Sequence, residues 1–473
     1  MLQDMLYSLP EISLIFGIIN LVILHIFSNE NPKVFAKVTR LWIMVSIFFS
    51  IMFYDKTFNN TYFESSSYTL LFKLLIAFFS YIMVILSPSW FVTENKTGCK
   101  YLILILCSLV INNLLISSSD IIVYICCYAM TIYINYRLLD ISYDKYPSEI
   151  SRKYLAISSI ILLLMVSGFA YFIINGGFLT NLNQIKEFLM SSKSDIKYYV
   201  AVSLIIIPIF YTLGLAPFHS LIEDKIGKSI LPVSHYFSII LPITFWGVLL
   251  KLKQTLLLPF EESISPVLIF IAVFSILLGA IGANARINLY RIFAYGSMYH
   301  FGVCVLMLSF FTHQADFGLI IYLLMYLLAL NGAYTVFYNL KSRGEFLSAI
   351  TSLSGLAKTR PFTTRALLIS IFSIIGIPPF AGFLAKFYLL NELILHKKYI
   401  LLAITLLFFL VLAKSYLEII KTAYFEQKMK NYDTENKIIL LTTLASITLI
   451  AIISFNPFGI IEKIKDMFYV IYS

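Results

Sequence analysis

The chain has 473 residues, of which 60% are hydrophobic and only 13% are charged. A soluble domain must cover its surface with polar groups, so this composition excludes an ordinary globular protein and indicates that lipid is the solvent. The net charge of +10 lies in short stretches between apolar segments, where membrane topology accounts for it. Nothing in the charge pattern therefore indicates a nucleic-acid partner.

Apolar segments long enough to cross a bilayer recur along the whole chain. At about 20 residues for each crossing of a ~30 Å hydrocarbon core, about fourteen helices are predicted. They cover residues 12–27, 38–54, 69–87, 101–117, 120–136, 155–178, 199–216, 232–250, 264–284, 289–311, 316–340, 364–395, 399–420 and 436–455. Because these apolar runs are continuous and do not alternate with a period of two, helices are favoured over barrel strands. The sequence therefore predicts an all-α polytopic membrane protein.

The loops indicate how the chain is oriented. Loops after odd-numbered helices carry about twice as many Lys and Arg residues as the opposite side, and such loops usually face the cytoplasm. Both termini are therefore expected on the non-cytoplasmic side. The first residues, Met1 to Asp4, lack a basic region and a cleavage site, so the first helix is expected to be retained.

The sequence offers no site for a redox cofactor or a metal. The five cysteines lack metal-ligand spacing, and there is no Gly-rich phosphate loop. The largest loops, around 137–154, 179–198 and 341–363, are too short to fold as a soluble domain. Nicotinamide, flavin or iron–sulfur chemistry would therefore have to occur on another chain.

Two predicted helices contain prolines that break them. The seventh reaches Pro217, and the twelfth contains Pro378 and Pro379. Proline removes a backbone donor and leaves carbonyls that need other partners, and an unbroken helix over 365–395 would span about 46 Å. Breaks at corresponding places in two halves are typical of inverted-repeat transporters, so two inverted five-helix repeats are predicted. Two unrelated proline kinks are the alternative.

Several motifs spread over most of the chain are specific when taken together. They are Leu9-Pro10-Glu11, Ala216-Pro217-Phe218-His219, the run from Asn288 to Gly302, and the run from Gly376 to Tyr388. Together they resemble subunit N of the bacterial proton-pumping NADH:quinone oxidoreductase, respiratory complex I, in the antiporter-like membrane subunit family. The pattern from Arg291 to His300 is shared with subunits L and M and with multisubunit cation/proton antiporters. The ending Lys386-Phe387-Tyr388 points more narrowly to subunit N.

This resemblance implies a subunit of the membrane arm in the bacterial inner membrane, among other membrane-arm subunits. It would help to move protons while NADH, FMN, iron–sulfur clusters and quinone are bound by other subunits. The resemblance and the helix pattern together predict four segments: residues 1–100 with helices 1–3, residues 101–251 and 252–421 with the two repeats, and residues 422–473 with the last helix and tail.

The family's conducting axis usually contains a glutamate on the fifth helix, lysines on the seventh and eighth, and a lysine on the twelfth. In this chain the glutamate position falls at or near Ala129, and the seventh-helix lysine falls on Thr212. The eighth-helix lysine falls near 241–243, where there is none. Only Lys386 matches the pattern.

Five side chains are candidates for proton transfer. Lys386, just beyond the second break, is the main candidate, and the alternative is a buried structural charge paired with Glu392 or a neighbouring subunit. His300 and His219 are auxiliary candidates, because imidazole titrates near neutral pH. His235 is a candidate replacement for the missing eighth-helix lysine. Lys414 either lines an exit path or pairs with Glu418, four residues along the same helix.

Two further charged residues, Lys73 and Asp120, are expected to snorkel or to cap their helices. Beside proton transfer, two other functions stay open from the sequence. One is a structural, non-pumping subunit of the same membrane arm, and the other is a subunit of a multisubunit cation/proton antiporter.

Overall fold

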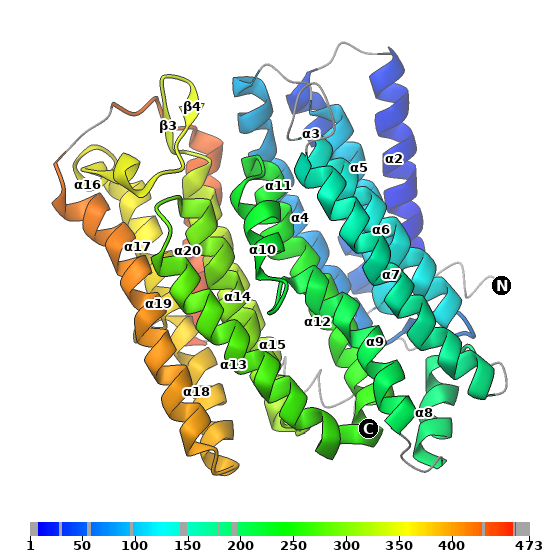
Figure 1. Ribbon diagram of the computed structural model, residues 1–473. Coiled ribbons are helices and arrows are strands. Elements are labelled where there is room, and N and C mark those ends of the chain that lie inside the picture. The colour runs from blue at the N-terminus through cyan, green and yellow to red at the C-terminus, as the bar shows by residue number, and fades with distance from the viewer. Residues whose placement is uncertain are drawn as a thin grey trace. The chain divides into compact units, whose positions relative to one another are not determined.

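The computed structural model of the chain describes residues 8–27, 31–53, 58–94, 98–141, 149–176, 179–191, 196–427, 431–456 and 459. Among these residues nearly all regular structure is helical (Figure 1), and eleven helices are long and apolar enough to cross a membrane. Two shorter apolar helices cover Lys197–Leu213 and Pro361–Ile375. The prediction of an all-α, multi-pass membrane protein is confirmed. The number of fourteen helices and the inverted repeats stay predictions.

The chain divides into two compact units. Unit 1 holds the described residues up to Leu213 together with Ile240–Ile264, and unit 2 holds Gly214–Ile239 and the described residues from Ser265 onward. Unit 1 thus ends its first segment at the predicted break in the seventh helix. The boundaries predicted at 100, 251 and 421 stay a prediction.

Unit 1 is a set of helices that pack side by side, together with one short antiparallel pair of strands. Its elements are α2 (Leu9–Phe27), α3 (Pro32–Met52), β1 (Phe58–Asn59), β2 (Glu64–Ser65), α4 (Ser67–Thr93), α5 (Cys99–Ser117), α6 (Ile121–Ile141), α7 (Glu149–Asn175), α8 (Leu182–Ser191), α9 (Ile196–Leu213), α12 (Leu241–Leu252), η3 (Lys253–Leu257) and η4 (Leu258–Phe260). Neighbours along the chain pack together, α2 on α3, α3 on α4, and α5 on α6.

Unit 2 is arranged around one central helix. Its elements are α10 (His219–Ile222), η1 (Glu223–Gly227), α11 (Leu231–His235), η2 (Tyr236–Ile240), α13 (Glu261–Asn284), α14 (Leu289–Leu308), α15 (His313–Phe337), β3 (Lys341–Ser342), β4 (Glu345–Phe346), η5 (Ile350–Leu353), α16 (Leu356–Thr359), α17 (Pro361–Ile375), α18 (Ala381–Leu395), α19 (Tyr399–Phe425) and α20 (Lys437–Phe455). η2 ends and α13 begins with residues that belong to unit 1. The central helix is α15, which packs against α14, α17, α18 and α20 and is buried along nearly its whole length.

Polar residues fix where the membrane helices begin. Ser66 and Thr69 form a reciprocal capping box at the start of α4. The Asn288 side chain accepts hydrogen bonds from the backbone of Tyr290 and Arg291 at the start of α14, and Thr312 caps α15. These side chains satisfy backbone donors that have no partner inside the helix, so each start is set locally by the sequence.

Both predicted breaks are present. α9 ends at Leu213 and α10 begins at His219, with Pro217 between them, while α17 ends at Ile375 and α18 begins at Ala381, with Pro378 and Pro379 between them. Each break follows a glycine with positive φ, +71° at Gly214 and +76° at Gly376. Only glycine adopts that conformation without a steric cost, so each helix stops at the residue before it.

Two predicted loops are helical. The stretch between the predicted helices 232–250 and 264–284 continues as α12, η3, η4 and α13, and residues 182–191 of the predicted loop 179–198 form α8. The charge of Lys251 suggested a loop, but its Nζ binds the Ser118 carbonyl oxygen at 2.8 Å and lies 3.4 Å from Glu64. Ser118 and Glu64 therefore bind the charge of Lys251 inside the fold, although the predicted helix had ended before this residue.

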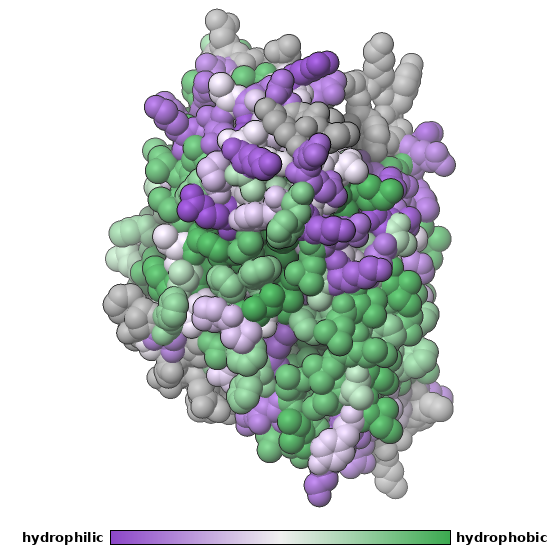
Figure 2. Space-filling view, turned by 90° about the vertical axis from the view of Figure 1, so that its left-hand side faces the viewer, coloured by the Kyte–Doolittle hydropathy of each residue, from purple (hydrophilic) through white to green (hydrophobic). Residues whose placement is uncertain are grey.

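A broad apolar surface covers the side of the molecule on which α19 lies. Figure 2 shows this side, with apolar side chains in a wide band and polar side chains gathered at its upper end. The exposed apolar side chains of α19 include Ile400, Leu406, Leu407, Leu410 and Leu417. A surface of this kind is suited to lipid tails or to the membrane helices of a partner.

Candidate functional site

Lys386 lies near the start of α18, and its side chain turns back toward the end of α17. Its Nζ donates a hydrogen bond to the carbonyl oxygen of Ile375, the last residue of α17, and lies 3.3 Å from the centre of the Phe409 ring. A helix C-terminus and an aromatic face both favour a cation. Within the described residues no carboxylate lies at ion-pair distance from Lys386. Its polar partners are therefore neutral.

Two glycines make room for this arrangement. A Cβ atom on Gly376 would lie 2.9 Å from Cδ of Lys386, and one on Gly382 would lie 1.7 Å from the carbonyl oxygen of Ser373. The second distance is far below any contact that real Cβ atoms make. Glycine at these two positions thus allows α17 and α18 to meet closely and Lys386 to fold back over the break.

The predicted alternative, a pair between Lys386 and Glu392, is not formed. Glu392 is buried, lies 3.6 Å from Nε2 of His396, and accepts a hydrogen bond from Thr312 at 3.2 Å. Glu392 is six residues after Lys386, which places it on a different part of the α18 surface. The other alternative, a partner on a neighbouring subunit, stays open.

His300, on α14, shares a small cavity with Lys386. The cavity has a volume of about 10 Å³, and His300, Tyr322, Tyr326 and Lys386 are among the side chains that line it. One water molecule needs roughly that much space. Nδ1 of His300 lies 2.8 Å from the Tyr322 hydroxyl, whereas Nε2 has no hydrogen-bond partner among the described protein atoms. The imidazole thus has one nitrogen in a hydrogen bond and the other available.

Tyr326 continues the polar contacts along α15, one helical turn after Tyr322. The His300 ring stacks on the Tyr326 ring with 4.1 Å between ring centres, and the Tyr326 hydroxyl lies 2.7 Å from the Ser297 hydroxyl. Residues four apart lie on one helix face, so both tyrosines face α14.

His235 is held by the next part of the same helix. Its Nε2 lies 3.2 Å from Oδ1 of Asn331, and its ring stacks on Tyr334 at 4.6 Å. The Tyr334 hydroxyl in turn lies 2.6 Å from the Ser238 hydroxyl and 2.9 Å from that of Ser234. His235 is only 1% exposed. The polar side chains of α15 thus run about 18 Å along the helix, from Tyr322 to Tyr334.

The sequence analysis did not predict these polar side chains of α15. Tyr322, Tyr326, Asn331 and Tyr334 lie in a segment that reads as an ordinary apolar helix. Tyr322 and Tyr326 share one face at a spacing of four, and Asn331 and Tyr334 share another at a spacing of three, but the step of five between the pairs turns about 140° round the helix, so no single polar stripe marks them in the sequence.

The other two candidates are placed apart from this network. His219 is partly exposed in the turn after Pro217, and its Nδ1 lies 3.0 Å from the Pro217 carbonyl oxygen. A carbonyl only accepts, so Nδ1 carries the proton. Lys414 is exposed on α19, and within the described part of α19 it forms no ion pair with Glu418. The predicted pairing of these two residues is therefore not formed.

Unit 1 has neutral hydrogen-bonding groups beside Ala129 and at Thr212. The hydroxyl of Tyr128, the neighbour of Ala129, lies 3.0 Å from the Thr212 hydroxyl and donates to the Pro208 carbonyl at 3.0 Å. Ser158 and Tyr211 form a second hydroxyl pair at 2.8 Å. Hydroxyl groups can donate and accept hydrogen bonds, but they do not carry a charge near neutral pH.

Unit 1 contains its own buried lysine, Lys73 on α4. The sequence favours snorkelling to the membrane surface for this residue, and that prediction is wrong. Lys73 is only 3% exposed, and its Nζ lies 2.7 Å from Oε1 of Glu11 on α2, which is equally buried. A carboxylate on a neighbouring helix makes the inward position favourable. The capping expected of Asp120 is confirmed, since its Oδ1 accepts from the backbone of Ile122 at 2.8 Å.

Comparisons with known proteins agree on one family. The family model described as NADH:quinone oxidoreductase/Mrp antiporter, transmembrane, matches residues 123–413. The chain is 27% identical over 465 residues to NADH-quinone oxidoreductase subunit N of Pelagibacter ubique, covering 96% of this chain and 97% of that protein.

Two solved structures have the same fold. A chain of respiratory complex I from Thermus thermophilus has a TM-score of 0.81 at 19% identity, with 96% of this chain and 98% of that chain covered. A chain of the Mrp complex from Dietzia has a TM-score of 0.82 at 16% identity, with 98% and 97% covered. At these identities the likeness shows the fold alone.

Proposed function

Because the chain belongs to the NADH:quinone oxidoreductase/Mrp antiporter transmembrane family, we propose that it is a membrane-arm subunit of a proton-translocating NADH:quinone oxidoreductase and that it transfers protons through unit 2. The observation that carries this proposal is the position of Lys386, which has neutral partners and shares a water-sized cavity with His300. A lysine that costs roughly 2.5–3.5 kcal/mol to insert into a membrane needs a reason to be there.

The geometry supports a short relay. The Lys386 ammonium gives a proton to a water molecule in the cavity, and that water passes a proton to Nε2 of His300. His300 then releases a proton from Nδ1 toward the Tyr322 hydroxyl, 2.8 Å away. Imidazole suits this role because its two nitrogens accept and donate at the same time. When Lys386 loses its proton, no buried carboxylate is left without a partner, so the neutral state is accessible.

In this proposal the chain itself carries out no redox chemistry. NADH, FMN, iron–sulfur clusters and quinone bind to other subunits, and the sequence supports this because it lacks a phosphate loop and a cysteine cluster. The chain lies in a bacterial plasma membrane with both termini on the non-cytoplasmic side, as the distribution of Lys and Arg suggests. Its partners are the other membrane-arm subunits.

The test is NADH-driven proton uptake by membrane vesicles that carry Lys386→Met, normalised to NADH oxidation and to assembled complex. We expect fewer protons per NADH with assembly intact. Lys421→Met is the matched control, because it removes an exposed lysine of α19 that is not a proton-transfer candidate and should leave the proton yield unchanged. An unchanged yield in the Lys386 variant would overturn the proposal.

A structural, non-pumping role in the same membrane arm is the second candidate. It is favoured by unit 1, where Ala129 and Thr212 fall at positions that carry charges in the family and Thr212 bonds to the neutral hydroxyl of Tyr128. The same vesicle assay separates the two functions, since a structural subunit would pump no less after Lys386→Met.

A multisubunit cation/proton antiporter is the third candidate, supported by the family model, whose description includes the Mrp antiporter. Such a transporter has no redox partner. Affinity purification of the chain under mild detergent distinguishes it, because co-purifying NADH dehydrogenase chains would exclude this function.

A further inference from the structure

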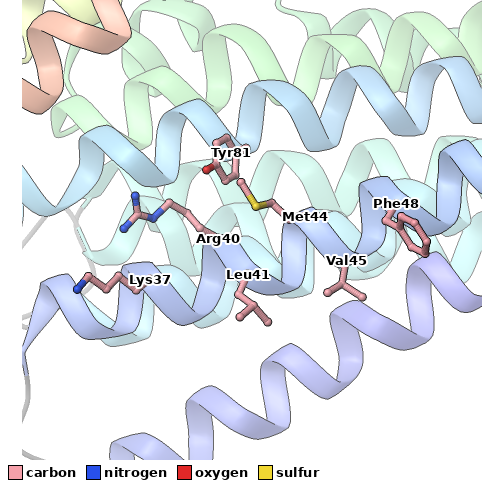
Figure 3. Close-up of a pocket in the computed structure, with 7 residues that line it drawn as sticks. All are labelled: Lys37, Arg40, Leu41, Met44, Val45, Phe48 and Tyr81. Carbon is pink, nitrogen blue, oxygen red and sulfur yellow. The ribbon is translucent and has the colours of Figure 1, made fainter.

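A groove on the surface of unit 1 lies between α3 and α4 and has a volume of about 440 Å³. Figure 3 shows two cations, Lys37 and Arg40, at one end of it, with Tyr81 of α4 beside Arg40. Arg40 donates from Nε to the carbonyl oxygen of Ala36 at 3.2 Å. In the described part of the chain neither Lys37 nor Arg40 forms an ion pair. Both positive charges are therefore available to a ligand.

The rest of the groove is apolar. Leu41, Met44, Val45 and Phe48 follow one another along α3, and Figure 3 shows Phe48 at the end opposite the cations. Leu41, Met44 and Phe48 are more than half exposed. These side chains face outward from a membrane-crossing helix, so they need an apolar neighbour that is not part of the described chain.

The length of the groove matches one leaflet of a bilayer. Lys37 and Phe48 are eleven residues apart, which corresponds to about 16 Å along a helix. Half of a ~30 Å hydrocarbon core is about 15 Å. A molecule with an anionic head at Lys37 and Arg40 and an apolar tail would thus reach Phe48 near the middle of the membrane.

We propose that this groove binds an anionic phospholipid, with the phosphate at Lys37 and Arg40 and one acyl chain along Leu41, Val45 and Phe48. Basic pockets beside membrane helices bind anionic head groups, and each Lys or Arg near the surface contributes about 1 kcal/mol. The hydroxyl of Tyr81 adds a donor at the level of the head group, where tyrosine is common. A partner helix on this face would have to bring its own buried carboxylate to neutralise two cations, whereas every anionic lipid already carries the required charge.

The site is independent of the proposed proton transfer, because it lies in unit 1 and uses none of the residues of the relay. It predicts that the protein prefers anionic over zwitterionic lipid. Native mass spectrometry of the purified complex, delipidated and then supplied with phosphatidylglycerol or phosphatidylcholine, measures that preference. We expect retained phosphatidylglycerol on the unmodified complex, and equal retention of the two lipids would overturn the proposal.

The charge arm of the test uses the double variant Lys37→Gln/Arg40→Gln. We expect about 30-fold weaker phosphatidylglycerol binding, the equivalent of about 1 kcal/mol for each charge. The matched control is Lys100→Gln/Arg152→Gln, which removes one exposed lysine and one exposed arginine outside the groove. An equal loss in the control would mean that the lipid is attracted by surface charge in general, and it would overturn the proposal of a specific site in the groove.

The apolar arm uses Val45→Trp, which keeps both cations and fills the path of the acyl chain. We expect weaker lipid retention, and an unchanged value would overturn the position of the chain. A photo-crosslinking residue in place of Leu41 gives an independent measurement that needs no loss of binding. Crosslinks to phospholipid support the proposal, and crosslinks to a protein subunit would overturn it in favour of a partner helix.

Discussion

Unit 1 and unit 2 each hold a lysine among membrane helices, Lys73 buried and Lys386 half-buried, but the two lysines have different partners. Lys73 of unit 1 lies 2.7 Å from Glu11, whereas Lys386 of unit 2 is held by a backbone carbonyl and an aromatic ring. A lysine paired with a buried carboxylate must keep its proton, because losing it would leave the carboxylate alone in a low dielectric. A lysine with neutral partners has no such constraint. On the proposed function, the partner of each lysine, and not its burial alone, decides whether the lysine is a structural charge or can exchange its proton.

The hydroxyl networks of the two units differ in the same way. In unit 1 the hydroxyls of Tyr128 and Thr212 bond to each other and Tyr211 bonds to Ser158, whereas in unit 2 Tyr322 bonds to His300 and Asn331 bonds to His235. A hydrogen-bonded chain that contains an imidazole can accept a proton, and one of hydroxyls alone does so poorly. On the proposed function, unit 2 is therefore the half of the chain that transfers protons.

The largest effect is expected from breaking the pair in unit 1. Glu11→Gln leaves Lys73 buried with no carboxylate, which should cost about 3–5 kcal/mol and lower the thermal midpoint of the purified complex. The double variant Glu11→Gln/Lys73→Met should recover most of that loss, because neither charge then remains. Glu262→Gln is the control, since Glu262 is exposed and its substitution should change the stability by no more than about 0.5 kcal/mol. A double variant no more stable than Glu11→Gln would contradict a structural pair.

The next effect concerns the relay in unit 2. His300→Phe keeps an aromatic ring against Tyr326 but removes both nitrogens, so the proton yield per NADH should fall as far as it does in Lys386→Met. Combining the two substitutions should lower the yield no further, because both residues act in one relay through one cavity. Additive losses would show that the two side chains act on separate paths.

The smallest effect is expected at Tyr128 of unit 1. Tyr128→Phe removes a hydroxyl bonded to Thr212 and to the Pro208 carbonyl, at a cost of about 1 kcal/mol, with the proton yield unchanged. Tyr124→Phe is a close control one turn earlier on α6, since the Tyr124 hydroxyl is buried without a hydrogen-bond partner among the described atoms. It should cost nothing. A drop in proton yield in Tyr128→Phe would contradict the difference proposed between the two units, because it would place unit 1 on the proton path.

The sequence by itself determined the class of the protein and the places where its helices break. Continuous apolar runs require helices in lipid, and Gly376 with Pro378 and Pro379 must end a helix, because these effects act within a few residues of the chain. Lys386 and His300 were identified as candidates from local motifs, and their part in proton transfer remains a proposal. The inverted repeats and the orientation of the termini remain predictions.

Only the tertiary structure decided which side chains meet. The pair between Glu11 and Lys73, the contact of His235 with Asn331, and the absence of a pair between Lys386 and Glu392 join or separate residues by helix packing. An apolar periodicity fixes which face of a helix is buried, but it does not fix which neighbouring helix that face contacts or at what height. Helix packing therefore sets the partners of each buried charge, and with them its chemistry.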